Sequence, residues 1–226
     1  MIKDALQIGP VRDEATTASA SQASSGVSSL QLLDGEGVFM LDTACAFHPS
    51  TTMLLELAVT HQTEWLAATS SVLDYGCGSG VLALAALRLS EAVNNPALKA
   101  FATDVNEAAL VSAARNAAIN GLGARLSLAL PWELSRSVRA QLVFANMLAG
   151  PLISVAVEIA MRTPPGATLL LSGFQRSDLA AVARAYAPWF DVPPEPLLEQ
   201  GGWLALKCVR TDAPLNSVDL AEQAVQ

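Results

Sequence analysis

The stretch Val72–Gly80, VLDYGCGSG, has the pattern of a buried strand that ends in an acidic residue and is followed by a glycine turn. The residues that come next, VLALAAL over 81–87, are mostly strong helix formers, so the turn is expected to open a helix. A strand, a glycine turn and a helix N-terminus in this order are typical of a nucleotide-binding α/β domain. Glycine suits the turn because it adopts positive φ at no steric cost and lets a ligand approach the backbone.

The spacing of the glycines indicates which cofactor this turn would bind. Gly76, Gly78 and Gly80 alternate and position 81 is Val, which differs from the G-x-G-x-x-G fingerprint of dinucleotide sites. The D-x-G-x-G-x-G pattern resembles the first motif of S-adenosylmethionine-dependent methyltransferases. That cofactor has no pyrophosphate, and Asp74 would add negative charge near a cationic ligand. We therefore predict that Asp74 and the three glycines bind S-adenosylmethionine, the alternative being a glycine turn in an unrelated doubly wound domain.

Length, composition and charge limit the class of protein. The 226 residues fit one domain, and a hydrophobic content of 52% is enough for a sizeable core. The net charge of −8 argues against a long nucleic-acid backbone as partner, because phosphate binding relies on clustered Lys and Arg. No apolar run reaches the ~20 residues of a membrane span. The three cysteines show neither metal-ligand nor disulfide spacing, so we expect no metal site and a cytoplasmic location, with an organelle as the alternative.

The order of elements predicts one α/β domain between two tails. Residues 1–29 and 211–226 are predicted to be flexible tails, the first because 15–29 is almost entirely Ala, Ser, Thr and Gly. The methyltransferase domain is expected over 30–210 and to begin with a hairpin near 30–41. Further strands are expected near 72–74, 99–103, 126–130, 140–145, 166–172, 189–192 and 202–209. Helices are expected near 51–66, 79–89, 107–120, 151–162 and 175–187.

Two residues at expected strand ends are candidates for holding the nucleoside. Asp104 ends the second strand of the domain, where an acidic side chain is positioned for the ribose hydroxyls. The alternative is that Asp104 caps the next helix, although Asn106 is already available for that. Trp132 follows the third strand, where it would either stack on the adenine or pack against the protein.

Asn146 ends the fourth strand, beside the first, and its side-chain carbonyl can accept a hydrogen bond from an amine. The alternative is a cap for the helix over 151–162. The residues that follow, 147–149, contain no aromatic side chain to stack on a flipped base, which makes a nucleic-acid substrate less favoured. His48 lies in a loop before a helix that Ser50 or Thr51 would cap, and it is a second candidate for the site.

Three segments together resemble the ribosomal protein L11 methyltransferase (PrmA) family: HPST over 48–51, VLDYGCGSGVLA over 72–83, and ANMLAGPL over 145–152. LSGF over 171–174 is a weaker fourth, and the resemblance covers about 40–210, the catalytic domain. It implies a seven-stranded Rossmann-like class I fold that binds S-adenosylmethionine. It further implies that Ser50 and Thr51 lie near the cofactor, that Asn146 lies near both cofactor and target amine, and that Leu148 lies beside it.

The resemblance implies an enzyme that methylates lysine amines of a protein, with a ribosomal protein as one candidate. No membrane is expected as a partner. Two departures from the family pattern keep alternatives open. The family's glycine-threonine-glycine loop before the His-Pro pair is replaced by Ala44, Cys45 and Ala46. The family's folded N-terminal domain, which recruits the ribosomal protein, has no counterpart in residues 1–40. The alternatives are a methyltransferase for small-molecule amines and a non-catalytic S-adenosylmethionine-binding protein.

Overall fold

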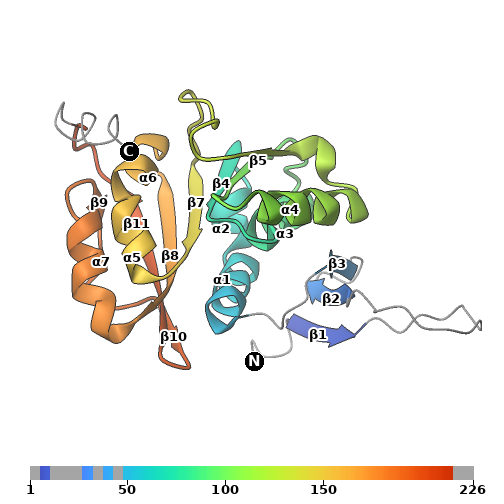
Figure 1. The fold of residues 1–226 in the computed structure, drawn as a ribbon, viewed down its shortest axis with the longest axis horizontal. Helices are drawn as coiled ribbons and strands as arrows, with labels where there is room; N and C mark the ends of the chain where they lie inside the picture. Colours follow the sequence, from blue (N-terminus) through green and yellow to red (C-terminus); the bar gives the residue numbers. More distant parts are fainter. Residues whose placement is uncertain (1–5, 11–26, 33–37, 43–47, 216–226) are drawn as a thin grey trace, which may run out of the picture.

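The computed structural model describes residues 6–10, 27–32, 38–42 and 48–215. In this part of the chain the main sheet has eight strands, in the order β10-β11-β8-β7-β4-β5-β6 with β9 paired to β11 (Figure 1). Their bounds are β4 Ser71–Tyr75, β5 Lys99–Thr103, β6 Leu126–Ala129, β7 Leu142–Asn146, β8 Thr168–Gln175, β9 Phe190–Asp191, β10 Leu198–Gln200 and β11 Trp203–Arg210. The α/β class and the Rossmann-like sheet are confirmed, and β10 is the strand that the sequence did not predict.

The strand order reverses beside β4, which is where open α/β sheets have their ligand crevice. Strands β6, β5, β4, β7 and β8 are parallel, whereas β11 is antiparallel to β8, β9 and β10. From β4 the chain adds β5 and β6 on one side and then returns to place β7 on the other side. Ligands of open α/β sheets bind outside the carboxyl ends of the strands at such a reversal.

Helices cover both faces of the sheet (Figure 1). One face packs against α1 Pro49–Thr60, α2 Gln62–Leu66, α3 Val81–Ala92 and α4 Glu107–Ile119. The other face packs against α5 Ala149–Ser154, α6 Ala156–Arg162 and α7 Leu179–Tyr186. Val72 and Leu73 show why both faces are apolar: successive residues of β4 point to opposite faces, and each enters a different core. No helix in the described residues is long and apolar enough to cross a membrane.

A separate three-stranded sheet precedes the main one along the chain. It consists of β1 Leu6–Pro10, β2 Val27–Leu32 and β3 Val38–Asp42, paired antiparallel in that order. The β2–β3 pair corresponds to the hairpin expected near 30–41. Two of these strands include residues of the predicted tail 1–29, most of which lies outside the described residues. The division into 1–29, 30–210 and 211–226 therefore stays a prediction.

Several helix boundaries differ from the expected ones. The helix expected over 51–66 is two helices that meet at His61, and the helix expected over 151–162 is two that meet at Val155. Capping of the first helix by Ser50 or Thr51 was wrong, because α1 begins at Pro49, two residues before the expected start, and its N-cap is His48. Proline is favoured at the first position of a helix, because the N–H group that it lacks would have no acceptor within the helix there. The 3-10 helix η2, Arg176–Asp178, precedes α7.

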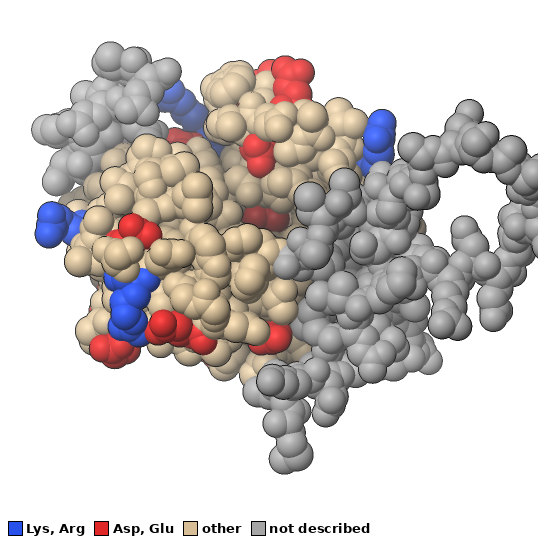
Figure 2. Space-filling model, turned by 60° about the horizontal axis from the view of Figure 1, so that its bottom comes forward, with Lys and Arg blue, Asp and Glu red and all other residues tan. Residues whose placement is uncertain are grey.

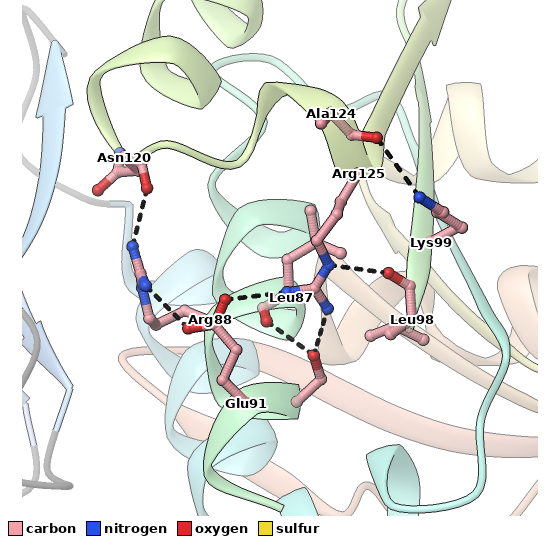
Figure 3. A network of polar contacts seen from close by, with 9 residues as sticks. Leu87, Arg88, Glu91, Leu98, Lys99, Asn120, Ala124 and Arg125 are labelled. Atoms are coloured by element: carbon pink, nitrogen blue, oxygen red, sulfur yellow. Dashed lines mark hydrogen bonds and ion pairs between the residues drawn. The ribbon is translucent and has the colours of Figure 1, made fainter. Parts of the chain in front are cut away.

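A polar network fixes the start of β5 against the end of α3 (Figure 3). Arg125, in the 3-10 helix η1 (Gly123–Arg125), donates to the carbonyl of Leu98 at 3.1 Å, to Glu91 at 2.9 Å and to the Ser90 hydroxyl at 2.7 Å. Arg88 also pairs with Glu91, at 2.8 Å. The network closes the connection between α3 and β5, and it thereby anchors the strand that ends next to Asp104.

Candidate functional site

The candidate residues meet at the carboxyl edge of the parallel strands, which is the lower edge of the sheet in Figure 1. The glycine turn follows β4, Asp104 follows β5, and Asn146 ends β7. The first turn of α1 comes to the same edge, because Thr51 contacts Asn146. The structure thus brings together segments that are up to 95 residues apart in the chain.

The glycine turn has the backbone that its sequence predicts. Gly76, Gly78 and Gly80 have φ of 77°, 52° and 76°, which side-chain-bearing residues rarely adopt. The N–H groups of Gly76 and Cys77 donate to the carbonyl of Thr103, and that of Gly80 donates to the carbonyl of Cys77. Gly78 N–H donates to the Asp104 carboxylate at 2.9 Å. These four amides bond within the protein, which leaves none of them for a pyrophosphate.

Asp74 lies behind the turn rather than in the crevice. Its side chain is 1% exposed, and its Oδ2 accepts the Ala83 N–H in the first turn of α3 at 3.1 Å. Its Oδ1 has no hydrogen-bond donor among the described residues. Burial, opposed by the Ala83 bond and aided by nearby Asp104, raises the pKa of Asp74 to about 7. Burial also raises the pKa of the Cys77 thiol well above its usual range, so this thiol is no nucleophile.

Asp104 connects β5 to the turn. One oxygen accepts the Gly78 N–H and the other accepts the Asn106 N–H, both at 2.9 Å. Asn106 itself caps α4 through the Ala108 N–H at 3.0 Å, so Asp104 is not the helix cap. The carboxylate is half-buried and has lone pairs left for a ligand.

Two large apolar side chains are exposed at the same edge. Val105 follows Asp104 and is 73% exposed, and Trp132 follows β6 and is 71% exposed. The packing alternative for Trp132 is not supported, because its ring is mostly in solvent. Val105 was not among the residues predicted from the sequence, although an apolar residue directly after the strand-ending acid is a signal in the sequence.

The start of α1 is fixed by His48. Its Nδ1 accepts the Ser50 N–H at 3.3 Å and lies 2.7 Å from the Ser50 hydroxyl. Because Nδ1 accepts from the backbone, the hydroxyl also donates to it, and the ring proton of a neutral His48 is on Nε2. Ser50 is 2% exposed, so its hydroxyl serves the helix start. The ring of His48 meets that of Trp203 edge to face, with centroids 4.4 Å apart, a contact that no sequence signal indicated.

Asn146 and Thr51 form the most informative contact of the site. Asn146 Nδ2 donates to Thr51 Oγ1 at 2.9 Å. This bond orients the amide and leaves its carbonyl oxygen without a donor among the described residues. Asn146 is therefore not the cap of the following helix, whose N-cap is Leu148. Leu148, two residues after Asn146, is 65% exposed. Ala44, Cys45 and Ala46 lie outside the described residues.

Comparison with known proteins identifies the family. The family described as ribosomal protein L11 methyltransferase (PrmA) matches residues 31–211. The chain belongs to this family. The ribosomal protein L11 methyltransferase of Klebsiella pneumoniae (strain 342) is 38% identical over 172 residues, which are 73% of this chain and 53% of that protein. The one from Pseudomonas paraeruginosa is 39% identical over 176 residues, or 74% and 54% of the two chains.

The chain thus spans about half the length of the curated relatives that it matches. Among solved structures, a ribosomal protein L11 methylase from Lactobacillus delbrueckii subsp. bulgaricus is 26% identical with a TM-score of 0.61, covering 73% of this chain and 80% of that one. An RNA methyltransferase from Salinibacter ruber with bound S-adenosyl-L-homocysteine has a TM-score of 0.53 at 14% identity, which shows the fold alone. The PrmA-like class I methyltransferase fold is confirmed.

The residues of the crevice fit S-adenosylmethionine, the cofactor of this family. The N–H groups of Gly76, Cys77, Gly78 and Gly80 are bonded within the protein, so none of these four is free for a phosphate. Asp74 is buried behind the turn and has one oxygen without a partner among the described residues, and a positive charge in the crevice would stabilise its ionised form. Asp104 offers acceptors for ribose hydroxyls, and Val105 and Trp132 offer apolar surface for an adenine.

Proposed function

We propose that this chain transfers a methyl group from S-adenosylmethionine to a lysine amine of a protein. The observation that carries the proposal is the Asn146–Thr51 bond, because it holds the amide at the end of β7, the strand beside β4 and its glycine turn, and leaves the amide oxygen without a donor among the described residues. A carbonyl oxygen there accepts from an amine N–H and leaves the nitrogen lone pair free to attack.

The cofactor would be held by Asp104 at the ribose and by the glycine turn below its methionine part. Bound there, it would supply an electrophilic methyl group on a sulfonium. Asp74 would act through the turn and through electrostatics, since it is buried against α3. Ser50 would act through His48 and the start of α1, whereas Thr51 would hold Asn146 directly.

The amine that reacts must be neutral, whereas a free lysine has a pKa of about 10.4. Exclusion of water lowers an amine pKa, because burial disfavours the charged form. The exposed Leu148 beside Asn146 would provide that apolar surface when a substrate covers it. No covalent enzyme intermediate is needed, so positioning of the amine supplies most of the rate.

A protein is the favoured substrate because the curated relatives carry the name ribosomal protein L11 methyltransferase. The face that holds the crevice is turned toward the reader in Figure 2. Among the residues coloured there, Lys and Arg do not gather into a patch, which supports a protein over a nucleic-acid backbone. A cytoplasmic location stays a prediction.

The proposal is tested by incubating the purified chain with tritiated S-adenosylmethionine and a bacterial cell extract. We expect label in a protein band of the mass of ribosomal protein L11, and none when the protein is replaced by Asn146→Ala. Label in a small-amine fraction would point to the first alternative. Cofactor binding by calorimetry without label in either fraction would point to the non-catalytic alternative.

A further inference from the structure

Met147 lies between the glycine turn and Asn146. It directly follows Asn146, and its N–H donates to the carbonyl of Ser172 in β8 at 3.1 Å. Its side chain runs under the cofactor turn: a Cβ atom at Gly76 would lie 2.6 Å from its Sδ and 2.8 Å from its Cγ. A single residue therefore contacts the turn that would hold the cofactor and continues into the loop that carries the acceptor asparagine.

Gly173 fixes the backbone of this residue. A Cβ atom at Gly173 would lie 2.5 Å from the carbonyl oxygen of Met147 and 2.8 Å from both its carbonyl carbon and its nitrogen. Real Cβ atoms do not approach backbone this closely, so a side chain at 173 would displace Met147. The neighbours that would move with it are Asn146 and Leu148, since a displaced peptide carries both flanking residues.

We infer that Met147, seated against Gly173 and under Gly76, is a positioning residue that sets Asn146 in register with the cofactor turn. The inference rests on the proposed function, because it concerns how amine and methyl group meet. Asn146 is held at two points: by Thr51 through its side chain and by the Met147 peptide through its backbone. Methyl transfer is sensitive to this register, since a displacement of about 1 Å can cost 100-fold in rate.

The test compares Gly173→Ala with Gly166→Ala. Both glycines have positive φ, 90° and 79°, so alanine strains the backbone at either position. A Cβ at Gly166 meets no described atom within 4 Å, so only Gly173→Ala pushes on Met147. The first readout is the side-chain amide resonance of Asn146 in the cofactor-free protein, assigned by its loss in Asn146→Ala. The second is kcat for methyl transfer beside the cofactor Kd.

We expect Gly173→Ala to shift the Asn146 amide resonance and to lower kcat about 30–100-fold with little change in cofactor Kd, whereas Gly166→Ala does neither. The inference is overturned if the two variants match in the resonance or in kcat. The resonance is read without any substrate, so an inactive wild-type chain would refute the proposed function and leave this inference to be judged on the resonance alone.

Should Gly173→Ala fail to fold, Met147→Ala supplies the second test. It keeps the backbone and removes the side chain from under Gly76. We expect a shifted Asn146 amide resonance and a loss of transfer of about 10-fold. The matched control is Met161→Ala, which truncates another half-buried methionine on α6. Equal behaviour of the two methionine variants would overturn the inference.

Discussion

Asp104 joins the strand, the turn and the proposed ribose contact in one carboxylate. Asp104→Ala removes the acceptor for the Gly78 N–H as well as the acceptors for the ribose. We expect the cofactor affinity to fall about 10–100-fold, as for the loss of charged hydrogen bonds. Titration calorimetry measures this, with Glu107→Ala as a control for charge in the exposed first turn of α4. Equal affinities of the two variants would remove Asp104 from the site.

Because of Asp74, we expect the free energy of unfolding to depend on pH in an unusual way. Its pKa, ordinarily 3.8, is raised to about 7 in the folded cofactor-free protein. Between these values the folded state keeps a proton that the unfolded state has released, so this residue makes the protein less stable as pH rises from about 4 to 7. Asp74→Asn cannot ionise and retains an oxygen that can accept the Ala83 N–H.

We therefore expect the free energy of unfolding of Asp74→Asn to exceed that of the wild type by about 1–3 kcal/mol near pH 8. Near pH 4 we expect the two free energies to be equal. Urea denaturation at both pH values provides the measurement. If the two proteins keep a constant difference across this range, the raised pKa of Asp74 is wrong.

At the scale of elements, we expect loss of the network around Arg125 to destabilise the fold without altering the crevice. Arg125→Ala removes the guanidinium group that donates to the Leu98 carbonyl, to Glu91 and to Ser90. We expect the free energy of unfolding to fall by about 2–3 kcal/mol, because partly buried partners of a charged donor lose their bonds. Chemical denaturation tests this against Arg136→Ala, an exposed arginine. A cost no larger than that of Arg136→Ala would contradict a structural role for the network.

Local sequence signals predicted the elements of the crevice but not the break between α1 and α2 or the short edge strand β10. The glycine turn and the strand-ending Asp104 depend on residues within one short stretch, so their spacing was sufficient to predict them. The break between α1 and α2 at His61 was not predicted, because the helical spacing of apolar residues continues across it to the buried Trp65, four residues after His61. The short edge strand β10 was not predicted because its three residues are largely exposed and carry no alternating pattern.

At the scale of the whole molecule, the sheet order turns distant segments into one site. The sequence placed Asn146 and Thr51 near the cofactor, through a resemblance for Thr51 and through strand order for Asn146. Their mutual hydrogen bond could not be read from spacing, because 95 residues separate them. The same holds for Gly173 and Met147, whose close approach exists only once β8 lies beside β7.

The central claim is that Asn146 orients a protein lysine for methylation, and one measurement addresses it directly. Purified ribosomal protein L11 is incubated with S-adenosylmethionine and either the wild-type chain or Asn146→Ala, and the product is analysed by tandem mass spectrometry. The account predicts methyl groups on a lysine nitrogen with the wild type, and at least about 100-fold slower transfer with the variant at an unchanged cofactor Kd. Equal transfer by both proteins, or methyl groups on another side chain, would contradict it.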